Sequence, residues 1–143
     1  NTDITYAFGS GKVTGSYGTA TAKVHADTLF TAQDETDGLG TEDDVKIEGL
    51  KTVLIRNVKL EAEAVLSQTD WYVTRKAEES TAIPSAITTH RKAVRSKQAA
   101  METAITNASD TPALETLYTV VNTADEGDDP VYARPLGEIP TLE

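Results

Sequence analysis

The chain has 143 residues, the size of one ordinary domain, which argues against an enzyme with separate cofactor and substrate domains. Its 23 acidic and 13 basic residues give a net charge of −10, so nucleic acid phosphates and anionic lipids would repel it. The absence of cysteine excludes disulfides, thiolate metal sites and cysteine nucleophiles. We therefore expect no nucleic acid and no membrane among its partners.

The hydrophobic content is below the average for globular domains. It is 38%, with two phenylalanines and one tryptophan, against about 45–50% in average globular domains when glycine is also counted. The core must then be thin. Either a neighbouring subunit completes the burial through oligomerisation, or the chain is a marginally stable monomer.

Residues 1–33 consist largely of glycine, serine, threonine and β-forming residues, which predicts a β-rich arm or small sheet. Gly9-Ser10-Gly11 can close a hairpin between two short strands. Between Ala20 and Asp27, small or apolar residues occupy every second position, as on one face of a strand.

Residues 34–48 carry seven acids and one lysine, which predicts a solvated acidic linker. A calcium-binding loop is a competing interpretation because the acids surround glycines. If Gly38 takes the sixth position of an EF-hand loop, however, the first falls on Gln33 and the twelfth on Asp44, so the expected ligands are missing. We therefore favour a plain acidic loop.

Residues 49–122 predict a helical unit of about three helices, so that the whole chain is expected to be an α+β protein. Apolar residues recur at helical spacing from Leu50 to Ser67, and again from Pro84 to about Asn107. A third helix is expected to begin at Asp110-Thr111-Pro112, a polar cap followed by a first-turn proline, and to end near Asn122.

Two segments around these helices lack a helical period. The aromatic stretch from Gln68 to Arg75 is expected to run extended along the helices. Residues 123–143 contain an acidic cluster and Pro130, Pro135 and Pro140, which predicts an extended acidic C-terminal tail. Because residues 51–100 have a net charge of +4 and the remainder −14, we also expect an acidic flank to lie near the helices.

The sequence offers few groups for catalysis. His25 and His90 have no partner at metal-ligand spacing, so a surface or hydrogen-bonded structural role is favoured for both. The glycine-rich strings around Ser10 and Ser16 have the wrong spacing for a serine hydrolase or a phosphate-binding loop. We therefore predict no enzyme, no catalytic residue, no cofactor and no metal site.

The candidate functional residues are of the kind that binds other proteins. Trp71, flanked by Asp70 and Tyr72, is either an anchor for a partner or a plug between the first two helices, with Asp70 capping a turn. Arg91 and Arg95 lie four residues apart on one helical face, where they would bind either an acidic partner or a neighbouring carboxylate. These five residues form the candidate partner interface.

Several short strings carry a family resemblance. They are Leu66-Ser67-Gln68-Thr69-Asp70-Trp71, Arg75-Lys76-Ala77-Glu78, Ala82-Ile83-Pro84, His90-Arg91-Lys92-Ala93-Val94-Arg95 and Glu102-Thr103-Ala104-Ile105. In this order they resemble the tail fibre assembly proteins and fibre-associated proteins of tailed bacteriophages, especially the marine phage type, over roughly residues 60–107. The sequence departs from that pattern at His90, where the family has tyrosine, and at Val94, where it has leucine.

The resemblance implies a structural, non-enzymatic virion protein, associated with the tail or fibre and made in the host cytoplasm. Its partners would be other tail, fibre or capsid subunits, and it would act as a homo-oligomer or in many copies. Two alternatives stay open. One is a chaperone for tail fibre assembly, and the other is a capsid decoration protein.

Overall fold

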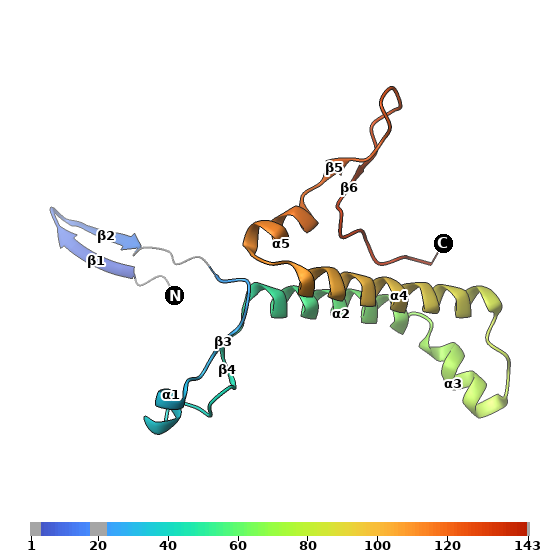
Figure 1. Ribbon diagram of the computed structural model, residues 1–143, viewed down its shortest axis with the longest axis horizontal. Coiled ribbons are helices and arrows are strands. Elements are labelled where there is room, and N and C mark those ends of the chain that lie inside the picture. The colour runs from blue at the N-terminus through green and yellow to red at the C-terminus, as the bar shows by residue number, and fades with distance from the viewer. Residues whose placement is uncertain (1–3, 18–22, 143) are drawn as a thin grey trace.

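The computed structural model describes residues 4–17 and 23–142. Two long helices, α2 (Leu50–Ser67) and α4 (Ser85–Asn107), run side by side in opposite directions and form the body of the protein (Figure 1). Three small two-stranded antiparallel sheets and three shorter helices surround them. The predicted α+β class is confirmed.

Helices α2 and α4 lie within one residue of their predicted limits because each carries an apolar stripe that faces the other. The core is built from small and medium-sized side chains along this seam, chiefly Val58, Ala62, Val94, Met101 and Ile105. Few aromatic rings contribute, in keeping with the thin core expected from the composition. None of the helices in the described parts of the chain is long and apolar enough to span a membrane.

The prediction of an extended segment after α2 was wrong, since residues Asp70–Glu79 form helix α3. Thr69 is buried at the junction, where its backbone N–H and its Oγ1 both donate to the carbonyl of Leu66, at 3.1 and 3.0 Å. These bonds end α2 and turn the chain into a new helix. Helix α3 ends at Ser80, whose φ of 58° is left-handed. The helix was missed because its apolar residues Trp71, Tyr72 and Val73 are consecutive and show no helical spacing. None of its residues is buried.

Helix α5 (Thr111–Tyr118) begins as predicted, with the Asp110 carboxylate accepting a hydrogen bond from the Ala113 N–H at 2.8 Å. It ends about four residues earlier than expected. The β-branched pair Val120-Val121 leaves the helix, and strand β5 (Val121–Asn122) pairs with β6 (Tyr132–Ala133).

The C-terminal segment is not simply an extended tail. After β6 the chain returns to the helices, and the Leu136 N–H donates to the Leu117 carbonyl at 3.0 Å. Leu136 and Ile139 are buried in the same core cluster as the α2–α4 seam. The Lys97 ammonium holds this return by donating to the Leu136 carbonyl at 2.8 Å. The C-terminal segment thus supplies apolar burial that the two long helices do not provide themselves.

The predicted N-terminal hairpin is confirmed. Strands β1 (Ile4–Gly9) and β2 (Lys12–Tyr17) pair in antiparallel register with Gly9 opposite Lys12. Ser10 and Gly11 have φ values of 51° and 70°, as a two-residue hairpin turn with two left-handed positions requires.

The strand expected from the alternation between Ala20 and Asp27 does not form in the described part of this segment. Residues 20–22 lie outside the described part of the chain, and residues 23–27 are irregular. They cross the beginning of α2, where the N–H groups of Leu50 and Lys51 donate to the carbonyls of Val24 and His25, at 2.9 and 3.0 Å. The segment therefore satisfies helix N–H groups that have no partner within the helix.

Asp27 completes this cap. Its carboxylate accepts hydrogen bonds from the Gly49 N–H at 2.6 Å and from the Thr52 hydroxyl at 2.7 Å, and both bonds lower the pKa of Asp27. Gly49 has to be glycine because a Cβ there would collide with the backbone of Ala26.

The predicted acidic linker is in part a small folded lobe. Strand β3 (Thr28–Leu29) pairs with strand β4 (Val45–Ile47). Helix α1 (Ala32–Thr36) belongs to the chain segment that connects the two strands. Thr31 and Asp34 form a reciprocal capping box at the start of α1. The Asp34 carboxylate also accepts a hydrogen bond from Lys46 Nζ at 2.7 Å, and these contacts lower its pKa to about 2.

Candidate protein-binding surface

The five candidate interface residues separate into two groups. Asp70, Trp71 and Tyr72 lie at the start of α3, and Arg91 and Arg95 lie on α4. A salt bridge of 2.8 Å between Arg91 Nη2 and Asp70 Oδ1 joins the two helices.

Arg91 is directed into its own chain. The residue is buried, and Nη1 donates to the Leu66 carbonyl and to Thr69 Oγ1, both at 2.7 Å. Of the two interpretations of this arginine, a bond to a neighbouring carboxylate is therefore confirmed. Arg91 positions α3 against the end of α2 and so determines where the aromatic residues stand.

Trp71 is half exposed, at 51%, which contradicts its interpretation as a plug between helices. Its ring lies 3.8 Å from that of Tyr72, centroid to centroid. The Arg75 guanidinium lies 4.7 Å from the Trp71 centroid and 5.5 Å from that of Tyr72. This aromatic cluster of Trp71, Tyr72 and Arg75 combines a rigid apolar surface with a cation, a composition enriched at protein interfaces.

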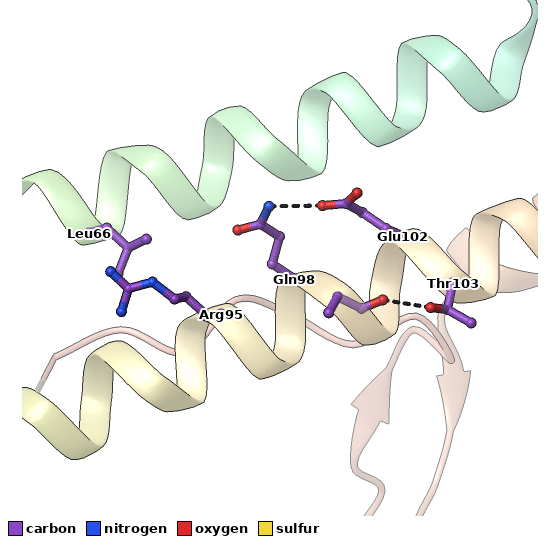
Figure 2. Close-up of a pocket in the computed structure, with 6 residues that line it drawn as sticks. Leu66, Arg95, Gln98, Glu102 and Thr103 are labelled. Atoms are coloured by element: carbon purple, nitrogen blue, oxygen red, sulfur yellow. Dashed lines mark hydrogen bonds between the residues drawn. The ribbon is translucent and has the colours of Figure 1, made fainter.

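Arg95 lines a shallow polar groove between α2 and α4 (Figure 2). Gln98 and Glu102 lie along the groove, with Gln98 Nε2 donating to Glu102 Oε1 at 2.8 Å. Lys59 Nζ approaches the other Glu102 oxygen at 3.6 Å. Arg95 does not join these pairs, since its Nη1 donates to the Arg91 carbonyl of its own helix at 3.4 Å. Among the described residues no carboxylate lies within ion-pair distance of Arg95, so the neighbouring carboxylate expected for it is not seen.

Large apolar side chains are also exposed on the small sheets, where none of the five candidate interface residues lies. The three sheets project from the helical body in different directions (Figure 1). Each sheet or its adjoining residues expose large apolar side chains: Tyr6, Phe8 and Val13 on the first, Leu29, Val45 and Ile47 on the second, and Val121, Val131 and Tyr132 on the third. The β-forming composition of these strands was visible in the sequence. The exposure of their apolar side chains was not, because it depends on whether another part of the protein packs over each sheet.

A second groove, apolar in character, lies between the beginning of α2 and helix α5. Leu50 and Leu54 form one side, Leu114 and Tyr118 the other, and Thr111 and Glu115 complete it. Burial raises the pKa of the Tyr118 hydroxyl, in keeping with its apolar surroundings.

The acidic flank approaches the helices at one point. Glu48 forms a bidentate pair with Arg56 of α2, at 2.8 and 2.7 Å, which agrees with the expected attraction. The C-terminal segment pairs with the opposite polarity, since its basic residue Arg134 lies 3.9 Å from Glu61 of α2.

The histidines are far from a metal-binding arrangement. Within residues 4–17 and 23–142, no group of three or more histidines and carboxylates is placed to hold a metal ion. The His25 carbonyl belongs to the cap of α2. His90 Nε2 is buried and has no hydrogen-bond partner in the described part of the chain, so the expected hydrogen-bonded role is not seen at that atom.

The fold and its exposed surfaces define an α+β protein with a helical body and three projecting sheets. Comparison of the chain with protein-family models, curated proteins and solved structures gave no match.

Proposed function

We propose that the chain is a structural, non-enzymatic bacteriophage virion protein that binds neighbouring tail or fibre subunits. The observation that carries this proposal is the set of three two-stranded sheets that expose large apolar side chains around a thin helical core (Figure 1).

The physical argument begins with the stability of such sheets. A two-stranded sheet is marginally stable in water unless it packs on another layer. Its outer edges also present unpaired N–H and C=O groups that can pair with a further strand. Three such sheets on one small protein fit a subunit whose burial is completed by its neighbours.

The aromatic cluster on α3 adds a second contact of a different kind. Trp71 and Tyr72 are presented on an exposed helix that Arg91 fixes to the end of α2. Large, preorganised aromatic side chains lose little conformational entropy on binding and frequently dominate interface energetics. Because the cluster lies within the segment that resembles phage tail proteins, it favours the tail or fibre as the location.

The proposal is tested by mass spectrometry of purified particles of the phage whose genome would encode this protein, with its copy number measured against a known virion subunit. Many copies per particle are expected. Presence only in infected-cell extracts would instead support the fibre assembly chaperone, and many copies on tailless capsids would support a decoration protein.

A matched pair of variants tests the aromatic cluster. Trp71→Ala should reduce incorporation into particles without unfolding the isolated protein. Val73→Ala removes another exposed apolar side chain, about 200° around α3 from Trp71, and should leave incorporation unchanged. Equal incorporation of both variants would remove the cluster from the interface.

A further inference from the structure

The polar groove between α2 and α4 has opposite charges at its two ends. Glu102 lies at one end, where Gln98 and Lys59 engage its carboxylate and neutralise it. Arg95 lies at the other end, seven residues or about 10 Å earlier along α4 (Figure 2). Lys92 comes three residues before Arg95, farther still from Glu102, and is its neighbour on the exposed side of the helix. We call Arg95 and Lys92 the cationic pair.

The cationic pair has no anionic partner in the described part of the chain. Neither residue lies within ion-pair distance of a carboxylate there, and both are exposed. An arginine side chain has five N–H donors. Within the described residues Arg95 uses one of them, in the long hydrogen bond of 3.4 Å to the Arg91 carbonyl. The charge and the remaining donors are therefore accessible to a carboxylate from outside the chain.

The β5–β6 hairpin carries the complementary charge. Its connecting residues 125–129, which we call the acidic tip, hold four exposed carboxylates: those of Asp125, Glu126, Asp128 and Asp129. None of these four is within ion-pair distance of a lysine or arginine that the structure describes. The Asp128 N–H donates to the Asp125 carbonyl at 3.2 Å, so the chain turns back and keeps the like charges close together. A cation brought to the acidic tip would relieve this repulsion.

Charge complementarity identifies a second copy of the chain as the occupant of the cationic pair. In Figure 1 the β5–β6 hairpin points away from α4, so the acidic tip does not reach the cationic pair of its own chain. Residues 85–100 of α4 contain four basic residues and no acid, whereas the acidic tip contains four acids and no base. Two copies of net charge −10 repel each other over most of their surfaces. Contact between these two segments would replace that repulsion with attraction.

We propose that the acidic tip of one copy binds the cationic pair of a second copy, with a tip carboxylate accepting two hydrogen bonds from the Arg95 guanidinium. The two surfaces differ, so the contact is head-to-tail, and every copy offers one surface of each kind. Repetition of the contact builds a ring or an open row of copies. This inference does not rest on the virion assignment, because it depends only on charges within the chain.

The first test measures association of the full chain by sedimentation velocity at several protein concentrations, in about 50 mM and about 500 mM NaCl. The wild-type chain should associate at the lower salt concentration and much less at the higher one. Arg95→Glu should weaken association about fivefold or more, as expected when an exposed ion pair is replaced by like charges.

The matched control for this variant is Lys12→Glu. It makes the same change of charge at an exposed residue of β2, outside the proposed contact, and should leave association nearly unchanged. A wild-type chain that stays monomeric, association that does not respond to salt, or equal effects of the two variants would each overturn the proposal.

A mixing experiment tests whether the contact is head-to-tail. The tip variant replaces the four carboxylates with lysine: Asp125→Lys, Glu126→Lys, Asp128→Lys and Asp129→Lys. The cationic-pair variant carries Lys92→Glu and Arg95→Glu. Each variant then has two surfaces of like charge and should be monomeric alone, whereas an equal mixture should associate because every contact again joins opposite charges. A mixture that stays monomeric, with the helical circular dichroism of both variants unchanged, would contradict the proposed contact.

Disulfide trapping locates the contact. The natural chain has no cysteine, so Pro130→Cys, beside the acidic tip, and Ala99→Cys, beside Arg95 in the groove, each introduce a single thiol and keep every charge of the contact. The two variants are mixed and mildly oxidised. Dimers that link one variant to the other should exceed the share expected from random pairing. A random share, or no disulfide, would show that the tip and the groove do not meet, and it would overturn the proposal while leaving the particle experiment unaffected.

Discussion

Replacement of Arg91 tests whether α3 is held by directed hydrogen bonds or by charge attraction. The guanidinium donates to the Leu66 carbonyl and the Thr69 hydroxyl in a buried position, and it also reaches the Asp70 carboxylate. The side chain of Asp70 is 60% exposed, whereas that of Arg91 is 10% exposed. The buried hydrogen bonds of Arg91 should therefore contribute more to stability than its ion pair with the exposed Asp70 carboxylate.

The magnitude follows from this geometry. A hydrogen bond that involves a charged group contributes about 1.5–3 kcal/mol. The lower end applies here because the Leu66 carbonyl keeps two other donors, the Thr69 N–H and Oγ1. Two such bonds give about 3 kcal/mol, while an ion pair with an exposed carboxylate gives about 0–1 kcal/mol. Arg91→Leu should lower the free energy of unfolding by about 3 kcal/mol, and Asp70→Asn by less than about 1 kcal/mol.

The assay is urea denaturation followed by far-ultraviolet circular dichroism, with the slope of the transition compared between variants. Arg91→Lys retains the charge but not the planar fork, so its cost should lie between the other two. If Asp70→Asn costs as much as Arg91→Leu, charge attraction holds the junction and the hydrogen-bond reasoning is refuted. A loss below about 1 kcal/mol for Arg91→Leu would refute it equally.

Three further predictions concern the core, the cap and pH. Met101→Ala should cost about 2–5 kcal/mol in thermal or urea unfolding, because Met101 is fully buried in the α2–α4 seam and its truncation leaves a cavity. Gly49→Ala should cost about 1–3 kcal/mol and release the Leu50 N–H to hydrogen exchange, since the new Cβ meets the Ala26 backbone, whereas Gly9→Ala meets no atom within 4 Å and should cost less. The pKa of Asp34 is lowered from 3.8 to about 2, so its contribution to stability is complete above pH 4 and is lost as the pH falls towards 2. A carbon-detected NMR titration of the Asp34 carboxyl would measure this directly, and a midpoint near 4 would contradict the contacts with Lys46 and Thr31.

The elements that could be predicted from the sequence are those whose signal is local. The limits of α2 and α4 follow from apolar residues at helical spacing, because each helix buries the resulting stripe against the other. The hairpin follows from the string Gly9-Ser10-Gly11, because glycine readily takes the left-handed conformation seen at Gly11. Even Arg91 carried a signal, since it occupies a stripe position between Ile87 and Val94 and is buried with them.

The elements that were missed depend on contacts between distant residues or on exposure. The ion pair between Asp34 and Lys46 joins residues that are twelve positions apart in the chain. The sequence of residues 34–48 has no periodicity that would predict this pair. Helix α3 lacks a buried stripe, so its helical character follows from the Thr69 junction and Arg91. Whether Trp71 faces the core or the solvent is decided by the direction that this junction imposes on α3, and the residues around Trp71 do not encode that direction.

The burial of Leu136 and Ile139 has a consequence for the synthesis of the protein. While the ribosome is still translating the chain, α2 and α4 can pair, but the side of their seam that these two residues cover stays open to water. The native core therefore closes only after residue 139 has left the exit tunnel. A nascent chain stalled before that point would expose apolar surface that the native protein buries.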